Sequence, residues 1–305
     1  MNQPSFLQSP EWEGFQKALG RATWRVKDVL IVRHKIGRGA LNYLYAGRPV
    51  FPEEIEPFLA EVQKIARHER SIFFRIDRAE LASHATIRDA VAAYGYRGRP
   101  LQPQRTVMLD LSQPEDRMLA AMREKTRYNI RLARKKDVVV KKVLRRGANE
   151  DFEVFWNLLG MTAQRNKFHT HGRRHYELLA ETRSPHFSNE LFFAEYQGVP
   201  IAAALVNFYQ PIFGVPGIAT YLHGASSNEA RRAMASYALH WHITTEAKQR
   251  GFGWYDLWGI DERKWPGLTR FKRGFGGREV AYAPPVEIVY RPFLAGVYRI
   301  AKWFR

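Results

Sequence analysis

Four basic side chains recur every four residues in the stretch that follows Ser112, and we call them the basic row: Arg123, Arg127, Arg131 and Lys135. Residues four apart lie on one face of a helix, so a helix here would carry a line of positive charge. Like charges at this spacing repel each other by roughly 0.2–0.5 kcal/mol per pair, which an anion lying across them would offset. The basic row therefore predicts an anion-binding face, and a solvated basic face is the alternative.

Three histidines have a spacing that is typical of metal ligands: His169, His171 and His175. No carboxylate of suitable placement accompanies them, and imidazoles bind metal best when a second group fixes the ring. The chain has no cysteine, which excludes disulfides and thiolate metal sites. We predict no metal site and interpret these histidines as surface or substrate-pocket residues.

The pattern Arg/Gln-x-x-Gly-x-Gly/Ala, with which acetyl-CoA-dependent N-acetyltransferases hold the CoA pyrophosphate, is incomplete here. The stretches Arg250–Gly253 and Arg273–Gly276 match its first four positions, but Tyr255 and Arg278 stand at the sixth. Glycine patterns for nucleoside triphosphates and dinucleotides are also missing from the sequence. We therefore predict that CoA is not the donor and that no cofactor is needed.

Composition limits the class of protein. The 305 residues suggest about two domains, and 45% hydrophobic content supplies their cores. Lys and Arg number 48 against 30 Asp and Glu, a formal charge of +18, which favours nucleic acid or an anionic membrane surface as a partner. The N-terminus lacks the layout of a secretory signal, and no apolar run approaches the roughly 20 residues that span a bilayer. We expect a cytoplasmic protein.

The elements that would position these residues are clearest in the second half of the chain. Hydrophobic patterning predicts a hairpin of two strands, residues 191–196 and 199–209, around the turn Gln197-Gly198. A third strand at 218–223, a helix at 234–245 and a buried fourth strand at 254–258 follow. This order is consistent with an α/β domain built on a mixed sheet. The first half has a similar succession of predicted strands and helices, so we predict two related α/β domains. The basic row would lie on one helix capped by Ser112.

Seven blocks of sequence are typical of one family, in its order: Phe6–Phe15, Arg75–Asp77, Gln102–Thr106, Met122–Ile130, Tyr221–Ser227, Tyr255–Ile260 and Phe271–Gly276. In these blocks the chain resembles the FemABX family of tRNA-dependent aminoacyltransferases, which build peptidoglycan cross-bridges. The resemblance implies two N-acetyltransferase-like domains with mixed sheets and no coiled-coil arm. We expect the first domain at residues 1–136, the second at 137–285, and a C-terminal strand and helix at 286–305 that return to the first.

The resemblance implies transfer of an amino acid from aminoacyl-tRNA to the stem-peptide amine of a peptidoglycan precursor, either lipid II or UDP-MurNAc-pentapeptide. The aminoacyl ester is already activated, so the enzyme must hold its substrates together and stabilise the oxyanion of the tetrahedral intermediate. Two alternatives stay open: a non-catalytic RNA-binding protein, and the same fold acting on another amine.

Catalytic and binding residues follow from the matching blocks. Lys272, which follows Phe271, matches the functional lysine of the family and would stabilise the oxyanion. Asp256 is placed to take a proton or position the amine, and a carboxylate that only caps a loop is the alternative. The resemblance implies precursor-binding residues at Tyr221, Arg231, Arg232, Tyr237 and Trp258, and it makes tRNA the anion for the basic row. Precursor diphosphate is the other candidate for that row.

The C-terminal segment mixes apolar residues with Arg291, Arg299, Lys302 and Arg305. As a helix, its apolar positions cover more than one face. The resemblance implies that it packs on the first domain. A second interpretation is that part of it touches the inner face of the plasma membrane, where basic and aromatic side chains suit the interface.

Overall fold

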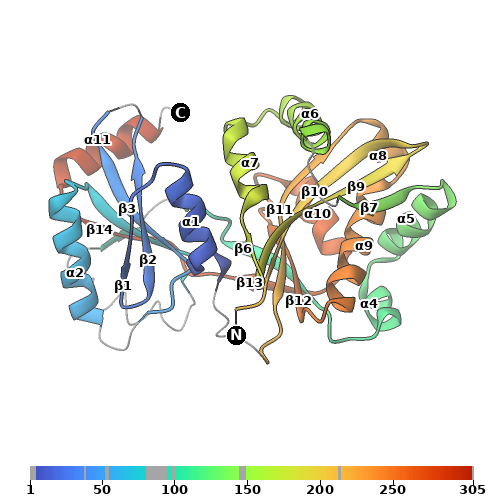
Figure 1. The fold of residues 1–305 in the computed structure, drawn as a ribbon, viewed down its shortest axis with the longest axis horizontal. Helices are drawn as coiled ribbons and strands as arrows, with labels where there is room; N and C mark the ends of the chain where they lie inside the picture. Colours follow the sequence, from blue (N-terminus) through green and yellow to red (C-terminus); the bar gives the residue numbers. More distant parts are fainter. Residues whose placement is uncertain are drawn as a thin grey trace. The chain divides into compact units, whose positions relative to one another are not determined.

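The structure is a computed structural model that describes residues 5–37, 39–51, 55–79, 95–97, 100–143, 149–211 and 214–303. The chain divides into two compact units, which are coloured along the sequence in Figure 1. Unit 1 comprises Met1–Gln104 and Ala281–Arg305, and unit 2 comprises Arg105–Val280.

Unit 1 is a six-stranded sheet with strand order β1-β2-β3-β4-β14-β5 and helices packed on it. Its elements are η1 (Phe6–Gln8), α1 (Pro10–Ala18), β1 (Thr23–Val26), β2 (Val29–Lys35), β3 (Asn42–Gly47), α2 (Ile55–His68), β4 (Phe73–Asp77), β5 (Gly95–Arg97), β14 (Val286–Val289) and α11 (Pro292–Trp303).

Unit 2 is an eight-stranded sheet with order β13-β6-β12-β11-β10-β9-β7, and β8 pairs with β9. Its elements are β6 (Arg105–Asp110), α4 (Glu115–Ala121), α5 (Glu124–Lys135), β7 (Val139–Lys142), α6 (Asn149–Asn166), α7 (Arg173–Glu181), β8 (Arg183–Ser184), β9 (Phe187–Tyr196), β10 (Val199–Tyr209), β11 (Ile218–Ser226), α8 (Glu229–Arg232), α9 (Ala235–Gln249), β12 (Trp254–Gly259), α10 (Pro266–Gly274) and β13 (Arg278–Ala281).

The two units repeat one pattern of strands. In unit 1, β1, β2 and β3 are antiparallel, α2 follows, and β4 is parallel to β3. In unit 2, β9, β10 and β11 are antiparallel, α9 follows, and β12 is parallel to β11. The prediction of two related α/β units with mixed sheets is therefore confirmed. Among the described residues no helix is longer than the 18 residues of α6, and none forms a coiled-coil arm.

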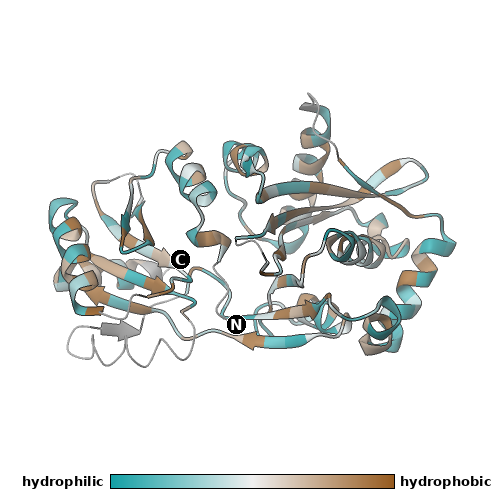
Figure 2. Ribbon diagram, turned by 60° about the horizontal axis from the view of Figure 1, so that its bottom comes forward, coloured by the Kyte–Doolittle hydropathy of each residue, from teal (hydrophilic) through white to brown (hydrophobic). Residues whose placement is uncertain are grey.

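Local sequence accounts for these elements where the pattern is strong. The β9–β10 hairpin turns at Gln197 and Gly198, whose φ angles of 52° and 76° are those that a tight two-residue turn requires. Figure 2 shows hydrophobic residues, in brown, along the strands of both units. In unit 2 they form a core between the sheet and α9 that includes Val206, Phe208, Leu239, Ile243 and Leu257.

The division between the units differs from the predicted boundary after residue 136. It falls after Gln104 because β6 pairs antiparallel with β12, which places β6, α4 and α5 in unit 2. At the other end the chain re-enters unit 1 at Ala281, and β14 pairs with β4 and β5. Each sheet thus pairs strands that are far apart in the sequence, and the local sequence does not indicate which strands will pair.

The helix predicted to begin at Ser112 is two helices. Met122 and Arg123 have extended backbone between α4 and α5, and the Arg123 amide donates to the Gly274 carbonyl at 2.9 Å. Ser112 does not cap α4, because its hydroxyl donates to Asp110 Oδ1 at 2.7 Å and Pro114 precedes the helix. The continuous helix was therefore a wrong prediction, and Arg123 stands at the start of α5 and not within it.

Candidate active site

Lys272 lies on α10, a helix that begins at Pro266, a residue suited to a first helical position. Its side chain is 4% exposed. Nζ donates to the Gly259 carbonyl at 2.8 Å and lies 5.5 Å from the ring centroid of Tyr221. Burial lowers the pKa of Lys272 to about 8, and the negative charge of Asp256 opposes that shift. The ammonium is thus a buried cation that loses its proton just above neutral pH.

Asp256 lies on β12 and is 1% exposed. Its Oδ1 accepts hydrogen bonds from the Thr106 hydroxyl of β6 and, at 2.8 Å, from the Trp258 amide. Trp258 has a left-handed φ of 59°, and the pairing of β12 with β6 is irregular between Asp256 and Gly259. Asp256 therefore holds the bend that presents the Gly259 carbonyl to Lys272. These are the contacts that the loop-capping alternative predicts.

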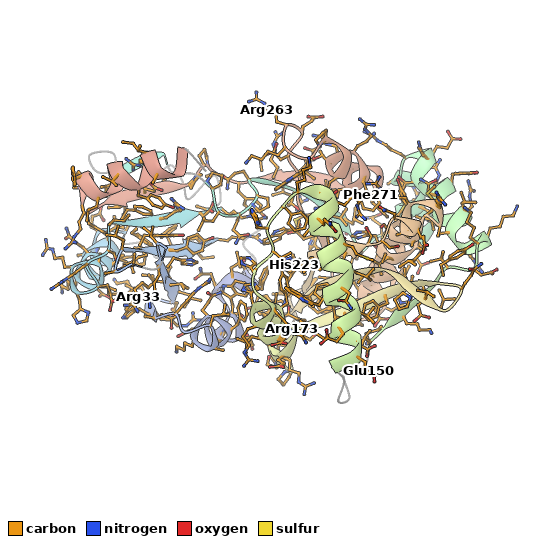
Figure 3. The ribbon with its side chains drawn as sticks, turned by 90° about the horizontal axis from the view of Figure 1, so that it is seen from above. Arg33, Glu150, Arg173, His223, Arg263 and Phe271 are labelled. Carbon is orange, nitrogen blue, oxygen red and sulfur yellow. The ribbon has the colours of Figure 1, made fainter. Side chains whose placement is uncertain are left out.

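Aromatic rings surround this lysine. Phe271, labelled in Figure 3, packs edge-to-face against Tyr237 at 4.9 Å and against His240 at 5.4 Å between ring centroids. His240 also lies 4.5 Å from Tyr221 and shares a 2.9 Å hydrogen bond between Nδ1 and the Tyr255 hydroxyl. Burial, and then the charge of Lys272, lower the pKa of His240 to about 3. His240 is therefore neutral and adds no positive charge beside Lys272.

Six of the predicted site residues thus come together in unit 2: Tyr221, Tyr237, Asp256, Trp258, Phe271 and Lys272. We call this group, with Thr106 and Gly259, the buried lysine site. Within it, the Gly259 carbonyl is the one hydrogen-bond acceptor of Lys272 Nζ among the described residues. An ammonium has three donors, so the arrangement can stabilise negative charge that develops on a bound substrate.

Arg231 and Arg232 are exposed on the short helix α8, and none of the described contacts joins them to the buried lysine site. The Arg232 carbonyl accepts from Lys136 Nζ at 2.6 Å, just beyond the end of α5. Burial and the positive charge of Arg231 lower the pKa of Arg165, whose guanidinium holds Ser226 through the carbonyl at 2.7 Å and the hydroxyl at 3.0 Å. The described contacts therefore place the Arg232 backbone beside Lys136, one residue after the basic row, and Arg231 near Arg165 of α6.

The basic row keeps three of its four members on one helix. Arg131 and Lys135 are exposed on α5, and Arg127 is partly buried because its guanidinium donates to the carbonyls of Met122 and Ala120. Thr126, Asn129 and Ala133 form the buried side of α5. Arg127 thus helps to hold the break between α4 and α5, whereas Arg131 and Lys135 face solvent.

Sequence reasoning gave no role to Thr106, His240, Tyr255 or Arg165. Thr106 is the last residue of a family block, but nothing local connects it with an aspartate 150 residues later. Tyr255 was noted as a mismatch to the CoA pattern and as the first residue of a family block, without a role. Strand pairing and burial are what reveal these contacts.

The predicted histidine group is part of an aromatic cluster. The rings of His171 and His175 stack at 4.0 Å, and Tyr176 packs edge-to-face on His223, which is labelled in Figure 3, at 4.9 Å. Burial and then the charge of His171 lower the pKa of His223 to about 4. Among the described residues, no group of three or more histidines or carboxylates is placed to hold a metal ion. His169 makes no ring contact of this kind among them.

In the part of the chain that the structure describes, no helix combines the length and apolarity required to cross a bilayer.

Comparison with known proteins agrees with this architecture. The model of the FemAB family matches residues 92–197 and 180–303, more than half of the chain. Lipid II:glycine glycyltransferase of Staphylococcus epidermidis is 20% identical, over 88% of this chain and 84% of that protein.

Two solved structures resemble the whole chain. The crystal structure of FemX has a TM-score of 0.78 at 18% identity, and the match covers 97% of this chain and 95% of FemX. The C-terminal domain of a lysylphosphatidylglycerol synthetase from Agrobacterium fabrum has a TM-score of 0.64 at 13% identity, with 99% and 93% covered. A tandem GNAT protein from the clavulanic acid biosynthesis pathway also matches, with a TM-score of 0.50 at 12% identity and with 85% and 78% covered. At these identities the likenesses show the fold, and they confirm the predicted class of two N-acetyltransferase-like domains.

Proposed function

The chain belongs to the FemAB family, and from this premise we propose that it is an aminoacyltransferase. The reaction would move an aminoacyl group from tRNA to the stem-peptide amine of a peptidoglycan precursor. The observation that carries the proposal is the buried ammonium of Lys272, held by Gly259 among aromatic rings. The related glycyltransferase, whose name gives lipid II as its acceptor, supports the same class of reaction.

The chemistry needs few groups. The acceptor amine attacks the ester carbonyl, the carbonyl oxygen becomes an oxyanion, and the ribose oxygen of tRNA leaves when the tetrahedral intermediate collapses. The amine gives up one proton and the ribose oxygen gains one, so the protons balance. Protonated Lys272 would stabilise the oxyanion through N–H groups that Gly259 does not use. No enzyme-bound acyl intermediate is required.

Asp256 would act as a positioning residue in this mechanism. Its hydrogen bonds to Thr106 and Trp258 fix the bend that carries Gly259, and its negative charge keeps Lys272 protonated at higher pH than burial alone would allow. Tyr221, Tyr237, Trp258 and Phe271 would form the walls against which the reacting groups lie.

We propose that the basic row binds the tRNA backbone. Arg131 and Lys135 are exposed on one face of α5, and the first residue of the row, Arg123, is joined to the helix of Lys272 through the Gly274 carbonyl. Arg231 and Arg232 keep their predicted role as contacts of the precursor's phosphates, since arginine pairs well with diphosphate. Because the Arg232 carbonyl accepts from Lys136 at the end of α5, tRNA is the alternative ligand for these two arginines.

Charged tRNA is a cytosolic substrate, so we propose a cytoplasmic enzyme. Peripheral contact with the inner face of the plasma membrane is part of the proposal, because a lipid-linked acceptor would be met there.

The decisive test supplies the protein with a pool of labelled aminoacyl-tRNAs and either UDP-MurNAc-pentapeptide or lipid II. Mass spectrometry of the products reads the added amino acid and the amine that received it. We expect one new amide bond on at least one acceptor, and its loss with Lys272→Met. Salt-sensitive tRNA binding without any product would instead favour the RNA-binding alternative. Labelling of some other amine would keep the reaction class and change the acceptor, and saturable acetyl-CoA binding would contradict the predicted donor.

A further inference from the structure

Helix α11 has apolar residues on two opposite sides. On the inner side Leu294, Ala295 and Tyr298 pack against the sheet of unit 1, where Tyr298 lies 5.5 Å from Phe73 between ring centroids. Unit 1 also holds the helix by an ion pair, because Arg299 donates to Glu287 at 2.9 Å and Glu287 is paired with buried Arg75. The helix is therefore a fixed part of unit 1.

The outer side of α11 is apolar as well. Phe293 is 81% exposed, Val297 48% and Ile300 63%. Their spacing of four and then three residues places the three side chains on one face of the helix, which we call the outer apolar face. Single exposed apolar residues are ordinary, but a continuous row on one rigid helix is typical of an interaction surface.

The charge near this face favours an anionic partner. Residues 290–305 contain no acidic residue, and the chain as a whole has a formal charge of +18. Arg291 is exposed directly before the helix. An anionic surface that also accepts apolar side chains is a complementary partner, and the interface of an anionic phospholipid bilayer has both properties.

We propose that the outer apolar face of α11 docks on anionic phospholipid bilayers, with Phe293, Val297 and Ile300 entering the interface and Arg291 contacting lipid phosphates. A helix of 12 residues lying flat on the interface needs no spanning segment. This inference extends the localisation part of the proposed function. Its test contains neither tRNA nor acceptor, so a failure here leaves the transfer reaction untouched.

The test is co-sedimentation of the full chain with vesicles of phosphatidylcholine alone or mixed with phosphatidylglycerol, at low and high salt. The unmodified protein should bind the anionic vesicles, more strongly at low salt. Phe293→Ser with Ile300→Ser should weaken that binding about tenfold or more, because two exposed apolar side chains no longer enter the interface. Arg291→Gln should reduce the dependence on salt with a smaller loss of binding.

The matched control is Val199→Ser with Met161→Ser, which removes two comparably exposed apolar side chains from unit 2. It should bind vesicles like the unmodified protein. Thermal unfolding of each variant checks that α11 stays packed, since none of the substituted side chains is buried. Equal binding by the α11 variant and the control would overturn the proposal, as would absence of binding to any vesicle. Light scattering measures the oligomeric state of each variant. A dimer that only the α11 variant dissociates would assign the face to a second copy and contradict the proposal.

Discussion

The buried lysine site and the basic row are both cationic parts of unit 2, but the first charge is buried and those of the row are in contact with water. Lys272 is buried with one hydrogen-bond acceptor, and burial lowers its pKa to about 8. Arg131 and Lys135 stand in water on α5, where each charge is well solvated. Taking a cation out of water is unfavourable for folding, so a buried one marks a position where the structure maintains a group for chemistry. Exposed cations act together and at longer range, as binding of a polyanion requires.

The largest expected effect comes from removing the buried charge. Lys272→Met keeps much of the side-chain volume and should lower kcat by about 100- to 1,000-fold, the usual result of losing one oxyanion donor. The measurement is single-turnover aminoacyl transfer well below the Tm. Lys264→Met, which alters an exposed lysine just before α10, should leave the rate unchanged. A rise in KM at constant kcat would remove Lys272 from catalysis.

The lowered pKa of Lys272 also predicts how stability changes with pH. Between pH 8 and 10.5 the unfolded chain still holds the lysine proton, whereas the folded chain has released it. Because the unfolded state binds more protons, the free energy of unfolding should rise with pH across this window, by up to about 3 kcal/mol.

Denaturant unfolding from pH 7.5 to 10.5 measures this contribution as the difference between the unmodified protein and Lys272→Met, which lacks it. Activity should fall over the same range, because the neutral amine no longer stabilises an oxyanion. Parallel stability curves for the two proteins would show that Lys272 is solvated like Lys135 of the basic row.

Thr106 tests whether the bend at the end of β12 depends on Asp256. Thr106→Val removes the hydroxyl that donates to Asp256 and should lower the free energy of unfolding by about 1–3 kcal/mol, because a buried acceptor loses a partner. Chemical denaturation gives this value, and the transfer assay should show a lower kcat with little change in KM. Thr106→Ser retains a hydroxyl and is the matched control. Equal effects of valine and serine would point to packing and not to the hydrogen bond.

The basic row should respond through binding and not through the rate of chemistry. Arg131→Glu with Lys135→Glu should weaken tRNA binding about tenfold or more and lower the slope of log affinity against log salt by about 1.4–1.8, since two phosphate contacts are lost. Filter binding at several salt concentrations measures both. The control is Lys64→Glu with Arg67→Glu on α2 of unit 1, which changes the net charge by the same amount. If both double variants weaken tRNA binding equally, the total charge and not the α5 face attracts tRNA. A higher KM for the precursor with normal tRNA binding would assign the basic row to the precursor's diphosphate.

The smallest effect, and the finest test, is the pH profile of Asp256→Asn. The negative charge of Asp256 raises the pKa of Lys272 against the effect of burial. Asparagine keeps the shape without the charge, so the alkaline fall in activity should move to lower pH, by less than about one unit. The kcat measured from pH 6.5 to 9.5, corrected for spontaneous hydrolysis of the ester, shows the shift. An unmoved alkaline limb would mean that the carboxylate acts only through its hydrogen bonds.

Short-range features of this protein can be predicted from neighbouring residues alone. The Gln197-Gly198 turn and the alternating residues around it specify the β9–β10 hairpin, and the blocks around Lys272 and Asp256 indicated the family. Such features depend on neighbours a few residues apart, where turn conformation and side-chain periodicity act directly.

Tertiary structure decided the rest, because it brings distant residues together. The pairing of β6 with β12 placed Thr106 on Asp256 and moved the unit boundary to Gln104. The Gly274 carbonyl met the Arg123 amide at the break between α4 and α5. Packing also turned one apolar side of α11 inward and left Phe293 outside. A lysine on a short basic helix gives no local sign of its burial, so its lowered pKa follows only from the fold that encloses it.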